Sequence, residues 1–196
     1  MTRLSSPSLL KEDIVLIDFG QSFFADHPPP NYAPATPLHY LSPEAFFESR
    51  TSFPSDIWAL GCTIFEIRAG SPLFDPFLGS DTLILKQIVE VLGKLPEPWW
   101  SSWEARQPAE EQRKEGVLLP VLKSSLHQKL REIGEQDDVP DVDGGRMIEK
   151  TGTRLDEAEI ELLADLLAKM LRYRPEDRIS IAEVVRHPWF DTLDRF

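Results

Sequence analysis

The sequence predicts a mainly α-helical protein with a short β-strand or hairpin remnant near its beginning. The stretch from Ser55 to Ala69 is largely apolar and is bounded by residue types that begin and end helices. A second stretch, after Asp156, repeats apolar residues at helical spacing. The run Ile14-Val15-Leu16-Ile17 is instead short and rich in β-branched residues, which favours a strand. These features predict a helical bundle built around one buried helix.

The composition fits one soluble domain. The 196 residues are 41% hydrophobic and 28% charged, which is ordinary for a globular protein with a substantial core. No apolar run approaches the roughly 18 residues of a membrane span, and the first residues lack the apolar segment of a signal peptide. The single Cys62 lies in an apolar run and cannot form an internal disulfide. We therefore expect a reducing compartment, the cytoplasm or the nucleus or both.

The net charge of −12 argues against non-specific binding to nucleic acid or to anionic membranes, because both require basic surfaces. It suits a basic protein substrate. The simpler interpretation, a solvated acidic surface that keeps the chain soluble, is favoured for most of this charge. Part of the acid is concentrated between Glu132 and Asp143, which hold six carboxylates and no lysine or arginine between them. We expect that stretch to be an exposed loop.

The first elements follow from proline, glycine and capping patterns. Residues 21–41 include Pro28-Pro29-Pro30 and predict a stiff loop, and a helix is expected from Pro43 to about Phe47. The central helix, Ser55 to Ala69, has Ser55 as its expected N-cap and Gly70 as its stop. Its residues 57–65 are apolar or small on every side, which predicts burial all round.

The next helix is expected over Asp81 to Leu92 and ends at Gly93. Between residues 94 and 155 the pattern is weaker. Its three tryptophans are expected to hold an irregular segment against the core, and Leu118 to Ile133 has helical spacing. The apolar face of the helix at 81–92 is formed by Ile84, Leu85, Ile88 and Leu92. The three tryptophans are Trp99, Trp100 and Trp103.

The C-terminal part shows two helix starts. Asp156 with Glu159, and Ser180 with Glu183, have the spacing of capping boxes. The first box opens a helix with one apolar stripe, and Pro188 is expected to end the second helix. The stripe is formed by Ile160, Leu163, Leu167, Met170 and Leu171.

The tripeptide Asp18-Phe19-Gly20 follows directly on the predicted strand. In isolation an acidic turn after a strand would be the favoured interpretation. It is followed in order by Ser42-Pro43-Glu44 and by Ser55-Asp56-Ile57-Trp58-Ala59-Leu60-Gly61. Together these three signals resemble the C-terminal lobe of a protein kinase, where such an aspartate binds magnesium.

The resemblance covers about residues 10–190 and is strongest to the SR-protein-specific serine/threonine kinases and their fungal relatives. The strings that carry this closer likeness are Ser55 to Cys62 and Val91 to Pro96. Leu41 departs from the pattern, because that group commonly has arginine there. The resemblance implies a partial kinase domain over residues 1–192. Its parts are the strand and metal motif (14–20), the activation and substrate loop (21–44), the central helix (55–69), an insert (94–155) and the terminal helices (156–190).

The resemblance also implies roles for individual residues. Asp18 would bind Mg²⁺, with Phe19 packed beneath it and Gly20 allowing the backbone to bend. Thr36 would lie beside the catalytic aspartate and support the substrate loop. The remaining three residues are structural: Glu44 would form a buried ion pair with Arg178, and Asp56 would hold the catalytic loop. For Asp56 an alternative remains open, namely an acidic residue at a helix N-terminus that is stabilised by the helix dipole. For Glu44 and Arg178 the alternative, two unrelated surface charges, is disfavoured.

Other motifs of this family are absent from the 196 residues. There is no Gly-rich loop, no phosphate-binding lysine and no His-Arg-Asp catalytic loop, and only 17 residues precede Asp18. ATP and Mg²⁺ are the cofactors of the intact family, and we expect the chain alone to be inactive, as a truncated gene product or a marginally stable fragment. The four histidines show no zinc-like spacing.

Two functions therefore remain open. The first is a monomeric fragment of an ATP-dependent serine/threonine kinase acting on basic, Arg/Ser-rich proteins. The alternative is a non-catalytic, pseudokinase-like module that docks basic partners. An unrelated helical protein ranks far below both, because every motif match would then be a coincidence.

Overall fold

The computed structural model describes residues 15–30, 32, 34–75, 81–105, 125–134 and 154–193. The chain divides into two compact units, Met1–Ala35 and Thr36–Phe196. Most of the expected insert lies outside the described residues, and so does most of the acidic stretch that ends at Asp143. No helix of the described part is both long and apolar enough to cross a bilayer.

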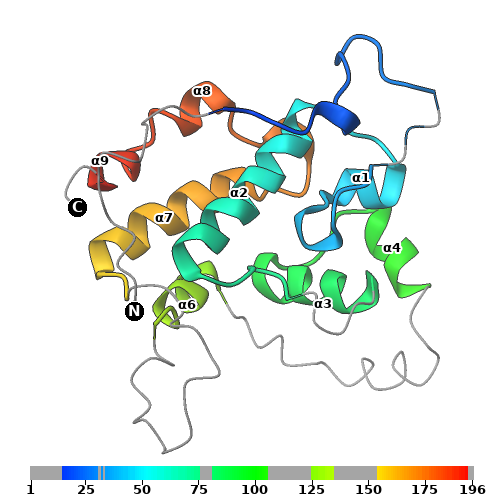
Figure 1. The fold of residues 1–196 in the computed structure, drawn as a ribbon. Coiled ribbons are helices and arrows are strands. Elements are labelled where there is room, and N and C mark those ends of the chain that lie inside the picture. Colours follow the sequence, from blue (N-terminus) through cyan, green and yellow to red (C-terminus); the bar gives the residue numbers. More distant parts are fainter. Residues whose placement is uncertain are drawn as a thin grey trace, which may run out of the picture. The chain divides into compact units, whose positions relative to one another are not determined.

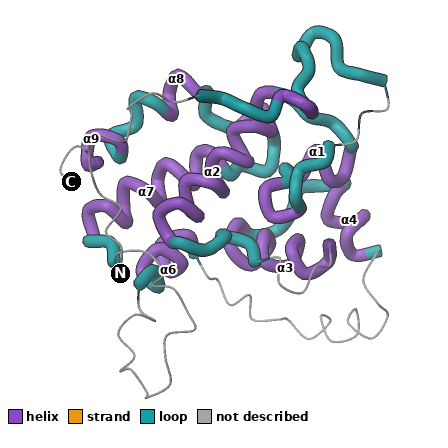
Figure 2. The backbone as a smooth tube through the Cα atoms, in the orientation of Figure 1, coloured by secondary structure: helices purple, strands orange, loops and turns teal. Residues whose placement is uncertain are grey.

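The described residues of the first unit contain one short 3-10 helix, η2 (Phe19–Gln21), and are otherwise irregular. The expected strand is not found: Val15, Leu16 and Ile17 are irregular and between 74% and 80% exposed. Figure 2 shows no strand anywhere in the described part of the chain. The expectation of a strand or hairpin remnant was therefore wrong for these residues. A β-branched run forms a strand only where a neighbouring strand takes up its backbone hydrogen bonds.

The second unit is helical, which confirms the mainly α prediction for the described residues (Figure 1). Two 3-10 helices accompany the α-helices. The elements are η3 (Leu38–Tyr40), α1 (Pro43–Glu48), α2 (Phe53–Ala69), α3 (Asp81–Leu92), α4 (Trp99–Glu104), α6 (Leu126–Arg131), α7 (Glu157–Met170), η5 (Pro175–Asp177), α8 (Ile181–Val184) and α9 (Phe190–Leu193).

Helix α2 begins earlier than the sequence suggested. Its N-cap is Ser52, and the expected N-cap, Ser55, lies at the third helical position. The Ser52 backbone N–H donates to Ser55 Oγ at 3.0 Å, so Ser55 closes the capping box from inside the helix. Pro54 does not prevent this start, because the first N–H groups of a helix have no partner within it. The helix ends as expected at Gly70, whose φ of 73° is left-handed.

Helix α2 packs against α7, with η3 and η5 also in contact with it. None of residues 57–65 is exposed, and Trp58 is completely buried. A Cβ on Gly61 would lie 3.1 Å from Leu171 Cδ2 and 3.3 Å from Met170 Cβ. The missing side chain therefore permits the close approach of the end of α7. Burial is not complete all round as expected, since Ala59, Leu60 and Thr63 are only partly buried, and beyond this stretch Ile67 is 80% exposed.

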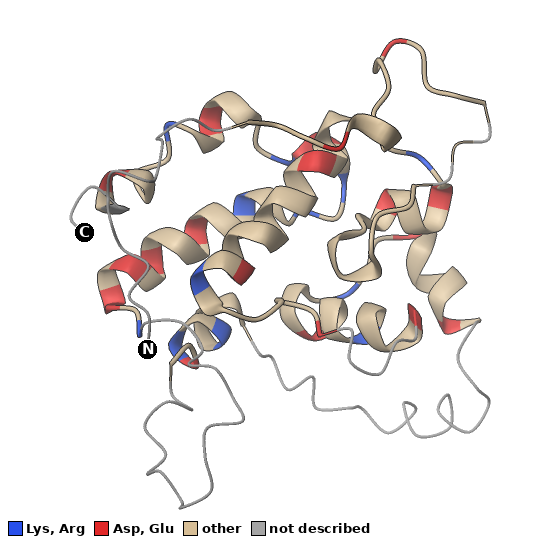
Figure 3. Ribbon diagram, in the orientation of Figure 1, with Lys and Arg blue, Asp and Glu red and all other residues tan. Residues whose placement is uncertain are grey.

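Helix α7 presents its predicted stripe to the core, where every member of the stripe is buried. The Asp156 carboxylate caps the helix by accepting the Glu159 N–H at 2.8 Å. The reciprocal half of the box is not formed, since the Glu159 carboxylate accepts from Arg68 at 2.7 and 2.9 Å instead. This ion pair joins α7 to α2. In Figure 3 the basic residues of α6 lie beside the acidic first turn of α7.

The tryptophans lie in helix α4, which corrects the expectation of an irregular segment. Trp99 and Trp103 are buried, and Trp99 stacks on Phe47 of α1 with ring centroids 5.5 Å apart. They do hold this segment against the core. Helix α3 has the predicted bounds, and α6 lies within the predicted helical stretch at 118–133, of which residues 118–124 lie outside the described part of the chain.

The last helices are short. The second capping box is complete, with the Ser180 N–H donating to Glu183 Oε2 at 2.8 Å. Helix α8 ends at Val184, well before Pro188, so the proline does not itself end it. His187 and Trp189 are buried, and His187 Nε2 lies 2.9 Å from Asp165 Oδ2. This tail is therefore part of the core.

Candidate functional site

The Asp18-Phe19-Gly20 motif forms a tight turn in the first unit. Asp18 adopts the left-handed conformation (φ 65°, ψ 58°) immediately before η2, which aspartate tolerates better than most residues. The Ser22 hydroxyl and backbone N–H both donate to the Phe19 carbonyl, at 2.8 and 3.0 Å. The bend expected at Gly20 is therefore made at Asp18.

The Asp18 side chain is exposed, and Phe19 is 65% exposed. Phe19 does not pack beneath the aspartate as the resemblance implied. No group of three or more metal-binding side chains occurs in the described residues. Magnesium is commonly held by one or two carboxylates together with nucleotide phosphates, so the single Asp18 carboxylate fits the part of one ligand.

Thr36 is exposed at the beginning of the second unit, and the segment after it contains η3. Tyr40 fastens this segment to α2, because its hydroxyl donates to Glu66 Oε2. The hydrogen bond to Glu66, together with burial, raises the pKa of Tyr40 to about 12. The loop that carries Thr36 is thus anchored to the central helix.

Glu44 and Arg178 form a buried two-pronged ion pair, 134 positions apart in the chain. Arg178 Nη1 donates to Glu44 Oε1 at 2.8 Å, and Nη2 donates to Oε2 at 2.6 Å. The Arg178 side chain is 0% exposed and the Glu44 side chain is 4% exposed. The family resemblance predicts this pair, and the structure brings the two residues together.

The pair is embedded in further hydrogen bonds. Arg178 also donates to three backbone carbonyls, those of Pro54, Arg172 and Tyr173, at 2.7 to 3.0 Å. Ser55 Oγ donates to Glu44 Oε1 at 2.8 Å. Burial would raise the pKa of Glu44, but the bonds from Arg178 and Ser55 outweigh it and lower the pKa. Glu44 therefore stays charged, and the network joins α1, the start of α2 and the segment around η5.

Asp56 lies in the first turn of α2 with an exposed side chain. Within the described residues we find no hydrogen bond to its carboxylate, and partial burial raises its pKa. Its negative charge in the first turn of the helix also interacts favourably with the helix dipole. The structure keeps both interpretations of Asp56 open. Glu44, Asp56 and Arg178 lie in the second unit, and Asp18 lies in the first.

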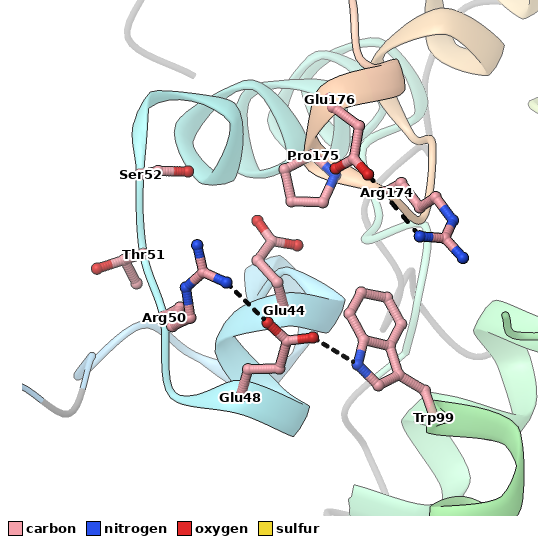
Figure 4. A pocket seen from close by; sticks show the side chains of 9 residues that line it. All are labelled: Glu44, Glu48, Arg50, Thr51, Ser52, Trp99, Arg174, Pro175 and Glu176. Carbon is pink, nitrogen blue, oxygen red and sulfur yellow. Dashed lines mark hydrogen bonds and ion pairs between the residues drawn. The ribbon is translucent and has the colours of Figure 1, made fainter. Parts of the chain in front are cut away.

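A pocket of about 240 Å³ opens beside the ion pair (Figure 4). No pattern of neighbouring residues predicts this pocket, because its walls come from segments far apart in the chain. Its best-fixed exposed group is Glu48, whose Oε1 accepts the Trp99 indole N–H at 2.9 Å. The other lining residues are Glu44, Arg50, Thr51, Ser52, Arg174, Pro175 and Glu176.

Comparison with known proteins agrees with these motifs. The model of the protein kinase domain matches residues 8–190. The chain belongs to the protein kinase domain family. The match includes all three motifs, both partners of the Glu44–Arg178 pair and the tail at Trp189.

The relatives of this kinase-family chain carry protein-kinase names. It is 27% identical over 194 residues to dual specificity protein kinase CLK1 of Homo sapiens, covering 96% of this chain and 35% of the relative. It is 30% identical over 188 residues to serine/threonine-protein kinase Doa of Drosophila melanogaster, covering 92% and 20%. For serine/threonine-protein kinase AFC1 of Arabidopsis thaliana the identity is 28% over 178 residues, covering 90% and 35%. The chain thus spans about a third of the length of CLK1 and of AFC1, and about a fifth of the length of Doa.

Proposed function

We propose that this chain is the C-terminal-lobe part of an ATP-dependent serine/threonine kinase for basic, Arg/Ser-rich proteins. The family match over residues 8–190 carries the kinase assignment. The buried Glu44–Arg178 pair supports it, because it joins two motifs that the resemblance expects to meet. The names of two relatives contain serine/threonine-protein kinase, which supports the choice of acceptor.

In this proposal the described residues have separate tasks. Asp18 would hold Mg²⁺, which supplies electrostatic stabilisation of the nucleotide phosphates during transfer. Thr36 would support the substrate loop, which Tyr40 anchors to α2. The Glu44–Arg178 network would fix the frame on which that loop rests.

We also propose that the 196 residues alone do not transfer phosphate. Catalysis of this reaction consists almost entirely of positioning and electrostatic stabilisation by several groups at once. Of the groups that contact the nucleotide or the acceptor, the sequence contains only the counterpart of the metal ligand, Asp18. ATP binding by the chain alone should accordingly be weak.

Substrate and setting remain part of the proposal. The net charge of −12 favours a basic protein partner, and this supports the likeness to the SR-protein-specific kinases. We infer a monomer that works in the cytoplasm or the nucleus. The single cysteine, Cys62, is buried and free, as a reducing compartment allows.

An activity assay tests both parts of the proposal. The purified chain, given ATP, Mg²⁺ and an Arg-Ser peptide, should show no turnover above background. A chimera with the segment that precedes the match in human CLK1 should phosphorylate the peptide. In the chimera Asp18→Asn should lower kcat by about a hundredfold or more, whereas Asp26→Asn, on the same loop, should have little effect. An inactive but folded chimera would contradict the kinase proposal. Turnover by the chain alone would contradict the proposal that the 196 residues do not transfer phosphate by themselves.

The second candidate function is a non-catalytic module that docks basic partners. The acidic charge favours it, and so does the pocket at Glu48, which needs no nucleotide. Binding of an Arg-Ser peptide without ATP, together with an inactive chimera, would favour this candidate over the first.

A further inference from the structure

The pocket of Figure 4 has a fixed negative wall. Glu48 Oε1 accepts the Trp99 indole N–H at 2.9 Å, and Trp99, only 7% exposed, is held in place by its stacking on Phe47. Glu44 also faces the pocket, but both of its oxygens are bonded to Arg178. The Glu48 carboxylate is therefore pre-positioned, and its second oxygen, Oε2, is paired with Arg50 at 3.3 Å.

The positive groups of the pocket are held loosely. Arg50 Nη1 lies 3.3 Å from Glu48 Oε2, on a side chain that is 81% exposed. Arg174 Nη1 lies 3.8 Å from Glu176 Oε1, and those side chains are 55% and 67% exposed. Exposed pairs of this kind contribute about 0–1 kcal/mol each. The cations of the pocket can therefore turn into solvent, whereas Glu48, although 38% exposed, is held by its hydrogen bond to the buried Trp99.

We propose that this pocket binds the side chain of an arginine from a basic protein partner, which displaces Arg50 from Glu48. A planar guanidinium can donate two parallel hydrogen bonds to a carboxylate, and its flat face can stack on an aromatic ring. Trp99 and Pro175 line the pocket, and so do Thr51 and Ser52, whose hydroxyl oxygens are further acceptors. Its volume of about 240 Å³ is below the range of about 300–1,000 Å³ typical of drug-sized ligands, which suits one side chain.

The structure favours a cation over an anion at this place for a physical reason. An anion would need Arg50 and Arg174 to be ordered, which costs side-chain entropy, and it would lie beside Glu44, Glu48 and Glu176. A cation needs only the fixed Glu48. The net charge of −12 adds a long-range attraction for basic segments.

The choice of an arginine-rich partner rests on the proposed function, but the binding does not require catalysis. The test uses the full 196-residue chain without ATP and a fluorescent Arg-Ser repeat peptide, with anisotropy as the measurement. Glu48→Gln keeps the acceptor for Trp99 and removes the charge, and it should weaken binding by about five- to tenfold. Arg50→Ala should strengthen binding, because it removes the internal competitor. A Lys-Ser peptide should bind more weakly than the Arg-Ser peptide.

Glu161→Gln is the matched control, since Glu161 is an exposed carboxylate of α7 outside the pocket. It should leave the affinity unchanged. The proposal is overturned if neither peptide binds, if Glu48→Gln binds as tightly as the natural chain, if Arg50→Ala fails to bind more tightly, or if Glu161→Gln weakens binding equally. Because the kinase proposal is tested by chimera turnover, failure of one leaves the other standing.

Discussion

Glu44 and Arg178 form a buried ion pair of the second unit. Both charges are buried. The N–H groups of the Arg178 guanidinium donate to the Glu44 carboxylate and to three backbone carbonyls, and Glu44 also accepts from Ser55. Arg178 Cζ also lies 5.2 Å from the ring centre of Trp58. A network this complete fixes the orientation of the segments it joins.

Removing one charge of this pair should be costly. Glu44→Gln leaves the Arg178 guanidinium buried without its counter-ion, which should lower the free energy of unfolding by about 3–5 kcal/mol. Glu157→Gln is the matched control, because Glu157 also forms a two-pronged pair, with Arg131, but at the surface. That change should cost less than about 1 kcal/mol. Urea unfolding measures both; equal losses would contradict the prediction.

The pair also predicts a pH dependence. The folded-state pKa of Glu44 is lowered from its ordinary 4.5, so its stabilising contribution is complete above that pH and is lost as the pH falls through the lowered value. The difference in unfolding free energy between the natural chain and Glu44→Gln should therefore shrink below about pH 4. A difference that stays constant down to pH 2 would count against this role.

At the scale of elements, α7 and α8 both begin where a side chain caps them, but tertiary contacts decide which half of a capping box forms. Ser180 and Glu183 are exposed to solvent and complete their box. Glu159 has the same sequence position relative to Asp156, yet its carboxylate is taken by Arg68 of α2. The interhelical bond replaces the local one, because a guanidinium is a stronger partner for a carboxylate than a single backbone N–H.

The cap at Asp156 supplies the test at this scale. Asp156→Ala removes the acceptor of the Glu159 N–H and should lower the free energy of unfolding by about 1 kcal/mol. Asp156→Asn keeps an acceptor and should lower the free energy of unfolding by only about a few tenths of a kcal/mol. Thermal or urea unfolding followed by circular dichroism distinguishes them. Equal losses for both variants would show that the charge, and not the cap, is what stabilises α7.

For the molecule as a whole, the second unit is organised around α2. This helix contacts α7, η3 and η5, and its N-terminus and C-terminal half carry the Glu44–Arg178 and Arg68–Glu159 links. Cys62 lies near its middle and is 1% exposed. Burial raises the pKa of its thiol to about 12, so the reactive thiolate is scarce at neutral pH.

Cys62 therefore reports on global opening. With a thiol reagent at pH 8, labelling of the native chain should be about a hundredfold or more slower than in denaturing urea, because a core residue is exposed only when the unit unfolds. As Cys62 is the single cysteine, no other thiol interferes. Rapid labelling in native buffer would show that the unit is marginally stable, as the sequence analysis expected for a fragment.

The sequence by itself determined the helical class, the bounds of α3, the starts of α7 and α8, and the pairing of Glu44 with Arg178, the last through family resemblance. These follow from signals carried by neighbouring residues or by a known motif. Only the tertiary structure decided that Ser52 caps α2, that Glu159 turns to Arg68, that residues 15–17 form no strand, and that Glu48 meets Trp99 in a pocket. The physical reason is that a side chain's final partner depends on which distant segments pack beside it, and local propensity carries no information about them.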